Sequence, residues 1–219
     1  MIIVAADTDS KGSIALLDCR NLKDIRLDVY ETPNRQRQLS NGSKRSETNY
    51  PALVATMVEL ISSAPVDKVY LEEQWSRPKQ GVASTFGFGQ TYGEYRAATA
   101  AGLLAAGTKL EDVESKIVCV PGKDWKPAMR LGDDKSLALS LATRLFPLCA
   151  QAWAIKTRHT SAAEASLLAL YGASKEGVKI PAGAIVRPFD KPLLTSFRSL
   201  VIEGSTRKAR KSAQKRHKG

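Results

Sequence analysis

Acidic side chains follow two predicted strands at positions where a metal-dependent reaction would need them. Asp7 and Asp9 come after the first apolar run of the chain, and Glu72 follows the run Val69–Leu71. Runs of β-branched and aliphatic residues are typical of buried strands, so these carboxylates come where a strand leaves the core. A further acid, Glu164, lies in an alanine- and leucine-rich segment that predicts a buried helix.

These acids predict a metal site. An ionised carboxylate at the edge of a core is costly unless a partner offsets its charge, and hard divalent cations prefer carboxylate oxygen. On an extended strand Asp7 and Asp9 would point to the same face. If the strand ending at Glu72 lies beside the first strand, a crossing helix could add Glu164. Such a cluster would hold one or two Mg²⁺ ions at the attacking and leaving oxygens of a phosphodiester.

Two further side chains are candidates for catalysis. His159 begins the last predicted helix and could ligate metal or move the proton of an attacking water, or it could simply stand exposed there. Lys126 follows Trp125 in a predicted loop or short helix, and it could neutralise transition-state charge or have no catalytic role. The chain has no GxSxG, CxxC or Walker A motif. Phosphoryl transfer depends on positioning and charge neutralisation more than on a covalent nucleophile.

Positive charge is concentrated in two segments of this chain, whose net charge is +11. One is the C-terminal stretch 207–219, which contains no acid, and the other is the polar stretch 33–49, which predicts a mobile loop. Basic arms beside an acidic metal site favour a polyphosphate partner, because each neutralised phosphate releases counterions. Alternatively, the tail only aids solubility; a membrane surface is disfavoured because the tail lacks an apolar face. The candidate DNA contacts here are Arg35, Arg37, Lys44, Arg45, Arg207, Lys208, Arg210 and Lys211.

Length and composition fit one compact domain. The 219 residues, of which 43% are apolar, can form a single core. No apolar run reaches the length of a membrane span, and no targeting segment is recognisable, so we expect a cytoplasmic location. The three widely spaced cysteines predict core thiols and not a zinc site. We expect a domain over 1–204 and a flexible basic tail over 205–219.

The predicted elements describe an α/β fold. Three strands in a meander are followed by alternating helices and strands, which predicts a mixed five-stranded sheet flanked by helices. Residues 173–204 show no clear pattern and are expected to be peripheral. Strands are predicted over 2–6, 13–18, 25–30, 66–72 and 117–120, and helices over 50–63, 84–106, 133–145 and 159–171, the last ended by a glycine.

The order of these elements resembles the RuvC type of Holliday junction resolvase, a branch of the ribonuclease H-like superfamily. The resemblance covers residues 1–172, and the motifs look closest to those of plant chloroplast members and their phage or bacterial relatives. The segments that carry it are Asp7–Asp9, Gly12–Ala15, Val69–Gln74, Ser84–Gly93, Trp125–Lys126, Arg144–Pro147, Ala163–Ala165 and Tyr171–Gly172.

This resemblance implies a specific activity and partner. The chain would be a homodimer that acts in DNA recombination and repair, each subunit nicking one of two opposed strands of a four-way junction with Mg²⁺ or Mn²⁺. Asp7, Glu72 and Glu164 would be metal ligands. Phe86 and Phe88 would lie near the junction centre, where an aromatic ring can stack on an unpaired base, although a core position is the alternative for either. Lys79, in the preceding loop, is counted among the DNA contacts.

The chain also departs from this pattern. Bacterial members place Asp or His three residues before the last carboxylate, where this chain has Ser161, and Asp9 is expected to supply the missing carboxylate. Glu164 stands where many members have Asp, which lengthens its reach. Glu73 competes with Glu72 for the ligand role, but strand alternation points the two to opposite faces, and the motif favours Glu72.

Several functions share these features. The first is a junction-resolving endonuclease, and the second is a related nuclease for other branched DNA or RNA–DNA hybrids. A catalytically silent DNA-binding protein is a third, but it would gain nothing from carboxylates packed against phosphates. An actin-like sugar kinase needs phosphate-binding loops in two halves, and this chain is long enough for only one.

Overall fold

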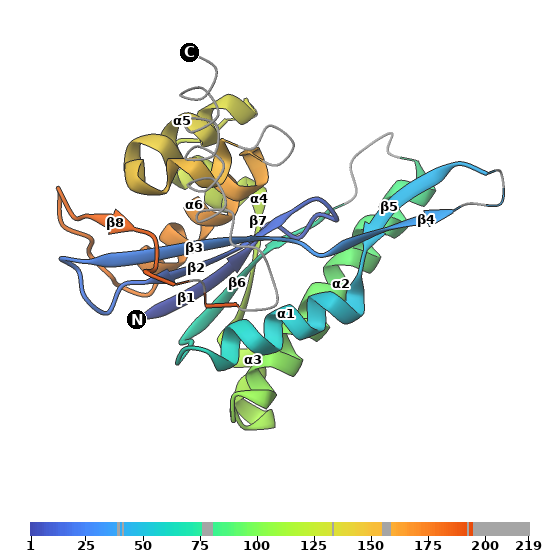
Figure 1. The fold of residues 1–219 in the computed structure, drawn as a ribbon, viewed down its shortest axis with the longest axis horizontal. Helices are drawn as coiled ribbons and strands as arrows, with labels where there is room; N and C mark the ends of the chain where they lie inside the picture. Colours follow the sequence, from blue (N-terminus) through green and yellow to red (C-terminus); the bar gives the residue numbers. More distant parts are fainter. Residues whose placement is uncertain are drawn as a thin grey trace, which may run out of the picture.

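A six-stranded mixed sheet forms the centre of the structure, a computed structural model that describes residues 1–38, 40, 42–75, 81–132, 134–154, 159–191 and 193–194 (Figure 1). The strand order is β7-β6-β1-β2-β3-β8. The strands are β1 (Ile2–Ala6), β2 (Ser13–Asp18), β3 (Ile25–Glu31), β6 (Lys68–Glu73), β7 (Ile117–Pro121) and β8 (Val186–Arg187).

The direction of the strands confirms the predicted fold class. β2 runs antiparallel to both β1 and β3, whereas β1, β6 and β7 run parallel to one another. The sheet is mixed, as predicted, and the five predicted strands are present. The short β8 adds a sixth strand, parallel to β3. The parallel strands β1, β6 and β7 bring their C-terminal ends to the same side of the sheet, where the candidate acids lie.

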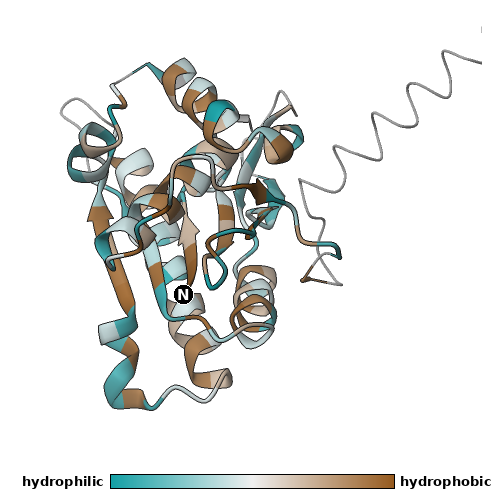
Figure 2. Cartoon of the chain, turned by 90° about the vertical axis from the view of Figure 1, so that its left-hand side faces the viewer, coloured by the Kyte–Doolittle hydropathy of each residue, from teal (hydrophilic) through white to brown (hydrophobic). Residues whose placement is uncertain are grey.

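Helices cover both faces of the sheet (Figure 1). Along β1, Ile2 and Val4 contribute to one apolar cluster, and Ile3 and Ala5 contribute to the other. Several strands are hydrophobic along most of their length, as expected where both faces are buried (Figure 2). One face carries α1 (Tyr50–Ser62), α2 (Val82–Ala105) and α3 (Leu110–Lys116), and the other carries α4 (Gly122–Ala128), α5 (Lys135–Leu145), a 3₁₀ helix (Pro147–Trp153) and α6 (His159–Lys175).

Local sequence explains several helix boundaries. Pro51 lies in the first turn of α1, where its missing N–H would have no intrahelical partner. Asp134 caps α5 by accepting a hydrogen bond from the Ser136 amide at 2.8 Å. α5 ends at Leu145, just before Phe146 and Pro147, because the residue before a proline is disfavoured in helical conformation.

The described residues within 33–49 form a β-hairpin, so the prediction of a mobile loop there is wrong. β4 (Asn34–Gln38) pairs antiparallel with β5 (Lys44–Thr48), and Gly42 adopts a φ of 80° in the connection. The strands are polar and lack the apolar alternation that normally predicts a strand. The local signal was Asn41-Gly42, a dipeptide typical of hairpin turns.

Part of the segment 173–204, which was expected to be peripheral, pairs with the outer edge of β3 through β8. Val186 and Leu194 are buried in the two apolar clusters. Arg187 bonds Asp24 beside the start of β3, with Nη2 2.7 Å from Oδ2. The Leu194 amide lies 3.4 Å from the Tyr30 hydroxyl, to which it donates. Residues 195–204 lie outside the described part of the chain. Among the described residues, no helix combines the length and hydropathy that crossing a bilayer requires.

Helix α6 continues past Gly172 to Lys175, beyond its predicted end. A Cβ at Gly172 would lie 2.7 Å from the Tyr70 ring, so this glycine permits close packing of the helix on β6 instead of ending it. Gly172→Ala should lower the free energy of unfolding by about 1–3 kcal/mol through overpacking. Urea denaturation measures this change.

Gly93→Ala is the matched control within α2, because a Cβ there meets no atom within 4 Å. It should raise stability by about 0.5–1 kcal/mol, because alanine favours the helical state over glycine. Equal effects of the two substitutions would contradict a packing role for Gly172.

Candidate active site

Asp7 and Glu72 lie side by side at the C-terminal ends of the neighbouring parallel strands β1 and β6. Ala6 and Leu71 are the last register partners of β1 and β6, and each acid is the next residue of its chain segment. The Thr8 hydroxyl donates a 2.6 Å hydrogen bond to the Glu72 carbonyl oxygen, which ties the two segments together. Both acids are buried, with exposed fractions of 8% and 7%.

Strand alternation distinguishes Glu72 from its neighbour, as predicted. Tyr70 belongs to the apolar cluster on the α6 face, and Leu71 belongs to the cluster on the opposite face. The Glu72 side chain therefore lies on the α6 face with Tyr70, and the Glu73 side chain leaves the strand on the α2 face. Glu72 is thus the acid that meets the third carboxylate.

The third carboxylate, Glu164, comes from α6 and meets Glu72 across a lysine. Lys126 of α4 places its Nζ 3.1 Å from Glu72 Oε1 and 3.4 Å from Glu164 Oε2. The adjacent Trp125 is fully buried, and its ring centroid lies 5.4 Å from the same Nζ. The structure thus gathers Asp7, Glu72, Glu164 and Lys126 from four elements.

The charges of this cluster do not balance. Burial, followed by the charges of Glu72, Glu164 and Asp9, raises the pKa of Asp7 well above its usual value, and Lys126 opposes this only in part. Burial also raises the pKa of Glu72 despite Lys126. Burial acts to lower the pKa of Lys126, but Glu72 and then Glu164 raise it overall. Buried acids with perturbed pKa values are typical of functional sites.

The donor set suits a hard divalent cation in its chemistry. Three carboxylates face one ammonium, so a further positive charge would offset repulsion that Lys126 leaves. Within the described ranges, however, no three acidic, histidine or cysteine side chains are arranged to hold a metal ion. The Lys126 ammonium lies between Glu72 and Glu164 instead.

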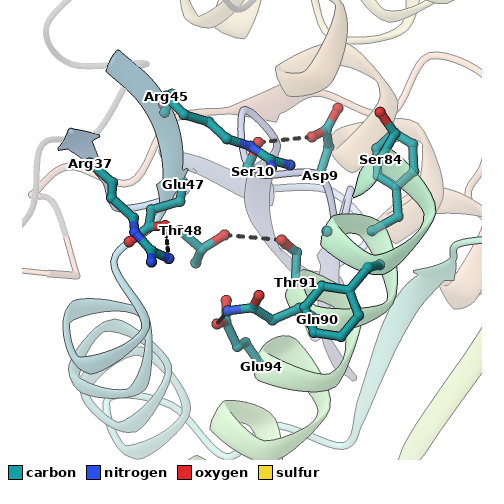
Figure 3. Close-up of a pocket in the computed structure, with 14 residues that line it drawn as sticks. Asp9, Ser10, Arg37, Arg45, Glu47, Thr48, Ser84, Gln90, Thr91 and Glu94 are labelled. Carbon is teal, nitrogen blue, oxygen red and sulfur yellow. Dashed lines mark hydrogen bonds and ion pairs between the residues drawn. The ribbon is translucent and has the colours of Figure 1, made fainter. Parts of the chain in front are cut away.

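Asp9 does not continue the strand of Asp7, so the expectation that they project from one extended strand is wrong. β1 ends at Ala6, and the chain turns, with the Gly12 amide donating to the Asp9 carbonyl oxygen at 2.9 Å. The Asp9 carboxylate accepts a hydrogen bond from Ser10 and lines a separate cavity beside the hairpin (Figure 3). Its role as a metal ligand stays a prediction.

Sequence reasoning did not find the partner of Ser161. Its hydroxyl lies 3.1 Å from that of Ser13 on β2, so a hydrogen bond between two hydroxyl groups occupies the position where the resemblance leads one to expect an acid or histidine. No sequence signal links two serines so far apart. His159 is the first residue of α6, and its side chain lies outside the described part of the structure.

A second residue missed by sequence reasoning is Trp75. An open cavity of about 860 Å³ is lined by Glu72, Glu164 and Lys126, and Trp75 also lines it with 63% of its surface exposed. An exposed tryptophan beside buried acids offers a stacking surface to a base. Its position just after the β6 acids was the available signal.

Some of the predicted DNA contacts lie in the described part of the chain and others lie outside it. Phe86 is exposed and Phe88 is half-buried, both in the first half of α2, so neither is fully in the core. The basic residues of the hairpin are exposed. The remaining candidates lie outside the described residues: Lys79, Arg207, Lys208, Arg210 and Lys211.

No protein-family model and no curated protein matches the chain. Its structural neighbours are RuvC Holliday junction resolvases. Thermus thermophilus RuvC in complex with a Holliday junction substrate aligns with a TM-score of 0.47 and 12% identity, covering 81% of this chain and 96% of that one. A second Thermus thermophilus RuvC structure aligns with a TM-score of 0.46 and 12% identity, covering 82% and 99%. The predicted closeness to plant or phage members stays a prediction.

Asp7→Asn should stabilise the metal-free protein at neutral and higher pH. Because the folded state raises the pKa of Asp7, the wild-type free energy of unfolding falls as pH rises from the unfolded pKa, about 3.9, through the raised folded value. Each unit of pKa elevation corresponds to about 1.4 kcal/mol. Urea unfolding in EDTA at pH 5 and pH 8 measures this, and a variant less stable than wild type at pH 8 would contradict it.

Lys126→Met should destabilise the metal-free protein, because it leaves Glu72 and Glu164 without their shared cation. We expect a loss of roughly 1–3 kcal/mol, less than for a fully buried pair, because the Lys126 side chain is 28% exposed. Added Ca²⁺ should stabilise this variant more than wild type.

Lys123→Met is the control for this comparison, since Lys123 is exposed on the same helix. Equal losses of unfolding free energy in the two variants, with equal stabilisation by Ca²⁺, would show that Lys126 does not hold the carboxylates together.

Proposed function

We propose that this chain is a structure-selective DNA endonuclease that resolves four-way junctions by metal-dependent hydrolysis of phosphodiesters. One observation carries the proposal: Asp7 and Glu72, buried where parallel strands end, meet the half-buried Glu164 of α6 around a single ammonium. Such a cluster costs stability, and phosphoryl transfer is a reaction that uses it.

In this proposal Asp7, Glu72 and Glu164 hold Mg²⁺, with Mn²⁺ as a substitute. When bound, the ion supplies positive charge at the phosphodiester and lowers the pKa of a water molecule. The chain itself positions the acids through the hydrogen bond from Thr8 to the Glu72 carbonyl. Lys126 contributes a fixed positive charge that stabilises the negative charge developing on the phosphate.

The surface chemistry supports a nucleic acid as the partner. The net charge is +11, and the hairpin presents four exposed basic residues, of which Arg37 and Arg45 line a cavity together with the exposed Phe86. Cations bind the phosphate backbone, and exposed aromatic rings stack on unpaired bases. Unpaired bases occur at the centre of a branch, which favours branched DNA over a regular duplex. The motif resemblance adds that two subunits would act together, each nicking one strand.

The alternative of a DNA-binding protein without catalytic activity fits the site less well. A protein that only binds DNA would bring phosphates toward these three carboxylates, which repel them. A nuclease for other branched DNA or for RNA–DNA hybrids would share the same carboxylates and differ only in its groove.

Incubation of the purified protein with a synthetic immobile four-way junction tests the proposal. We expect paired symmetric nicks that require Mg²⁺ and that Asp7→Asn abolishes while binding persists. The rate should fall by about 10³-fold or more, because Asp7 is proposed as a direct metal ligand.

Replication forks, flaps and RNA–DNA hybrids serve as parallel substrates. Metal-dependent cleavage of these, with the junction left intact, would keep the chemistry and change the substrate. Tight binding without cleavage of any substrate would overturn the assignment of an enzyme.

A further inference from the structure

Helix α4 approaches the Glu72 carboxylate with one of its faces. Gly122, Trp125 and Lys126 are spaced three and four residues apart, so they lie on the same side of the helix. β7 leads directly into this helix, and Glu72 is the register partner of Val120 near the end of β7. The pairing of β6 with β7 therefore fixes where Glu72 stands relative to α4.

Gly122 leaves the space that the Glu72 carboxylate occupies. A Cβ at this position would lie 2.8 Å from Glu72 Oε1, which is closer than Cβ atoms approach other groups in proteins. A larger residue would therefore displace the carboxylate. Lys126 Nζ lies 3.1 Å from the same oxygen. Two residues of this helix face thus restrict the position of Oε1.

Trp125, the third residue of this face, brings a buried N–H group to the same carboxylate. The residue is fully buried, and among the residues that the structure describes its Nε1 atom has no partner within hydrogen-bonding distance. Burial raises the pKa of Glu72, whereas Lys126 and the hydrogen-bonding side chain of Trp125 act to lower it. The indole N–H is therefore near the Glu72 carboxylate without completing a full hydrogen bond in this structure.

The other buried tryptophan shows what a core position alone requires. A buried indole N–H without an acceptor costs free energy, so tryptophans in protein cores usually donate theirs. Trp153 is 3% exposed, and its Nε1 donates to Thr143 Oγ1 at 2.9 Å. Trp125 is buried as deeply, but the acceptor beside its N–H is an acid of the proposed active site. This contrast favours Glu72 as the partner of the Trp125 N–H.

We propose that Trp125 is a positioning residue for Glu72, whose carboxylate its indole N–H orients for binding a divalent cation. Gly122 and Lys126 limit the remaining freedom of the same carboxylate. A hydrogen bond to the side chain of a metal ligand fixes its orientation, and loss of such a bond lowers metal affinity by roughly 10- to 100-fold. This inference rests on the proposed function and deepens it, because it identifies what orients one of the three acids.

Metal binding by the full chain without DNA tests the proposal. Trp125→Phe removes the N–H and should raise the Kd for Mn²⁺, measured by electron paramagnetic resonance of the free ion, by about 10- to 100-fold. Trp153→Phe is the matched control, because it removes the same group from a buried tryptophan whose N–H bonds Thr143 instead of an acid. It should bind Mn²⁺ as the wild type does. Equal Kd values for the two variants would overturn the proposal.

A tryptophan analogue separates the N–H from the packing of the ring. 3-Benzothienylalanine keeps the bicyclic shape and has sulfur in place of the N–H, so a chain that contains it at position 125 keeps the core filled. Its Kd for Mn²⁺ should still rise by about tenfold. Wild-type affinity with this analogue would show that Trp125 acts only by packing, and the proposal would fail.

Indole resonances of the metal-free protein report the contact independently of catalysis. The chain has three tryptophans, and Trp→Phe variants assign their three indole N–H signals in a ¹H–¹⁵N spectrum. Glu72→Ala should shift the Trp125 signal upfield and speed its hydrogen exchange. Glu73→Ala removes the neighbouring acid, which leaves the strand on the opposite face, and should leave the signal in place. A Trp125 signal that ignores Glu72→Ala would contradict the proposed hydrogen bond.

These experiments separate the role of Trp125 from the proposed function. If the wild type binds Mn²⁺ and cleaves junctions, and the chain with the analogue binds Mn²⁺ equally well, the proposed function stands and the positioning role is wrong. If the wild type binds no Mn²⁺, the proposed function and this inference both fail.

Discussion

The structure depends on the gathering of three carboxylates, two of them buried, around one ammonium where parallel strands end. Asp7 and Glu72 are held by the register of β1 with β6, and Glu164 is held by the packing of α6 on the same face. Lys126 is held by its buried neighbour Trp125. Because each charge sits on a different rigid element, repulsion cannot separate the acids without unpacking the core. The remainder of the fold supplies the stability that this cluster costs.

The distribution of charge outside the cluster complements it. Positive charge on the α2 side of the sheet comes from the exposed basic residues of the hairpin. Lys126 provides it on the α6 side. The carboxylates thus have Lys126 beside them on the α6 side of the sheet, and the arginines of the hairpin lie on the α2 side.

Sequence reasoning found the elements whose signals are local. Apolar runs predicted the five main strands, strand alternation separated Glu72 from Glu73, and the acid in the last helix joined Glu72 at Lys126 as expected. It missed the hairpin, since its polar strands carry no apolar alternation. It also placed Asp9 on a strand that ends earlier, and it ended α6 at Gly172, whose reason is contact with Tyr70. The Ser13–Ser161 pair exists only through tertiary contact.

The turn after β1 links the carboxylate cluster to the cavity beside the hairpin. Asp7 faces Glu72 and Lys126 on the α6 side, whereas Asp9 lines the hairpin cavity on the α2 side. Residues two apart normally share a face of a strand. β1 ends at Ala6, before both acids, so the side chains of Asp7 and Asp9 do not have to share a face. The turn after β1 therefore joins the carboxylate cluster to one wall of the hairpin cavity.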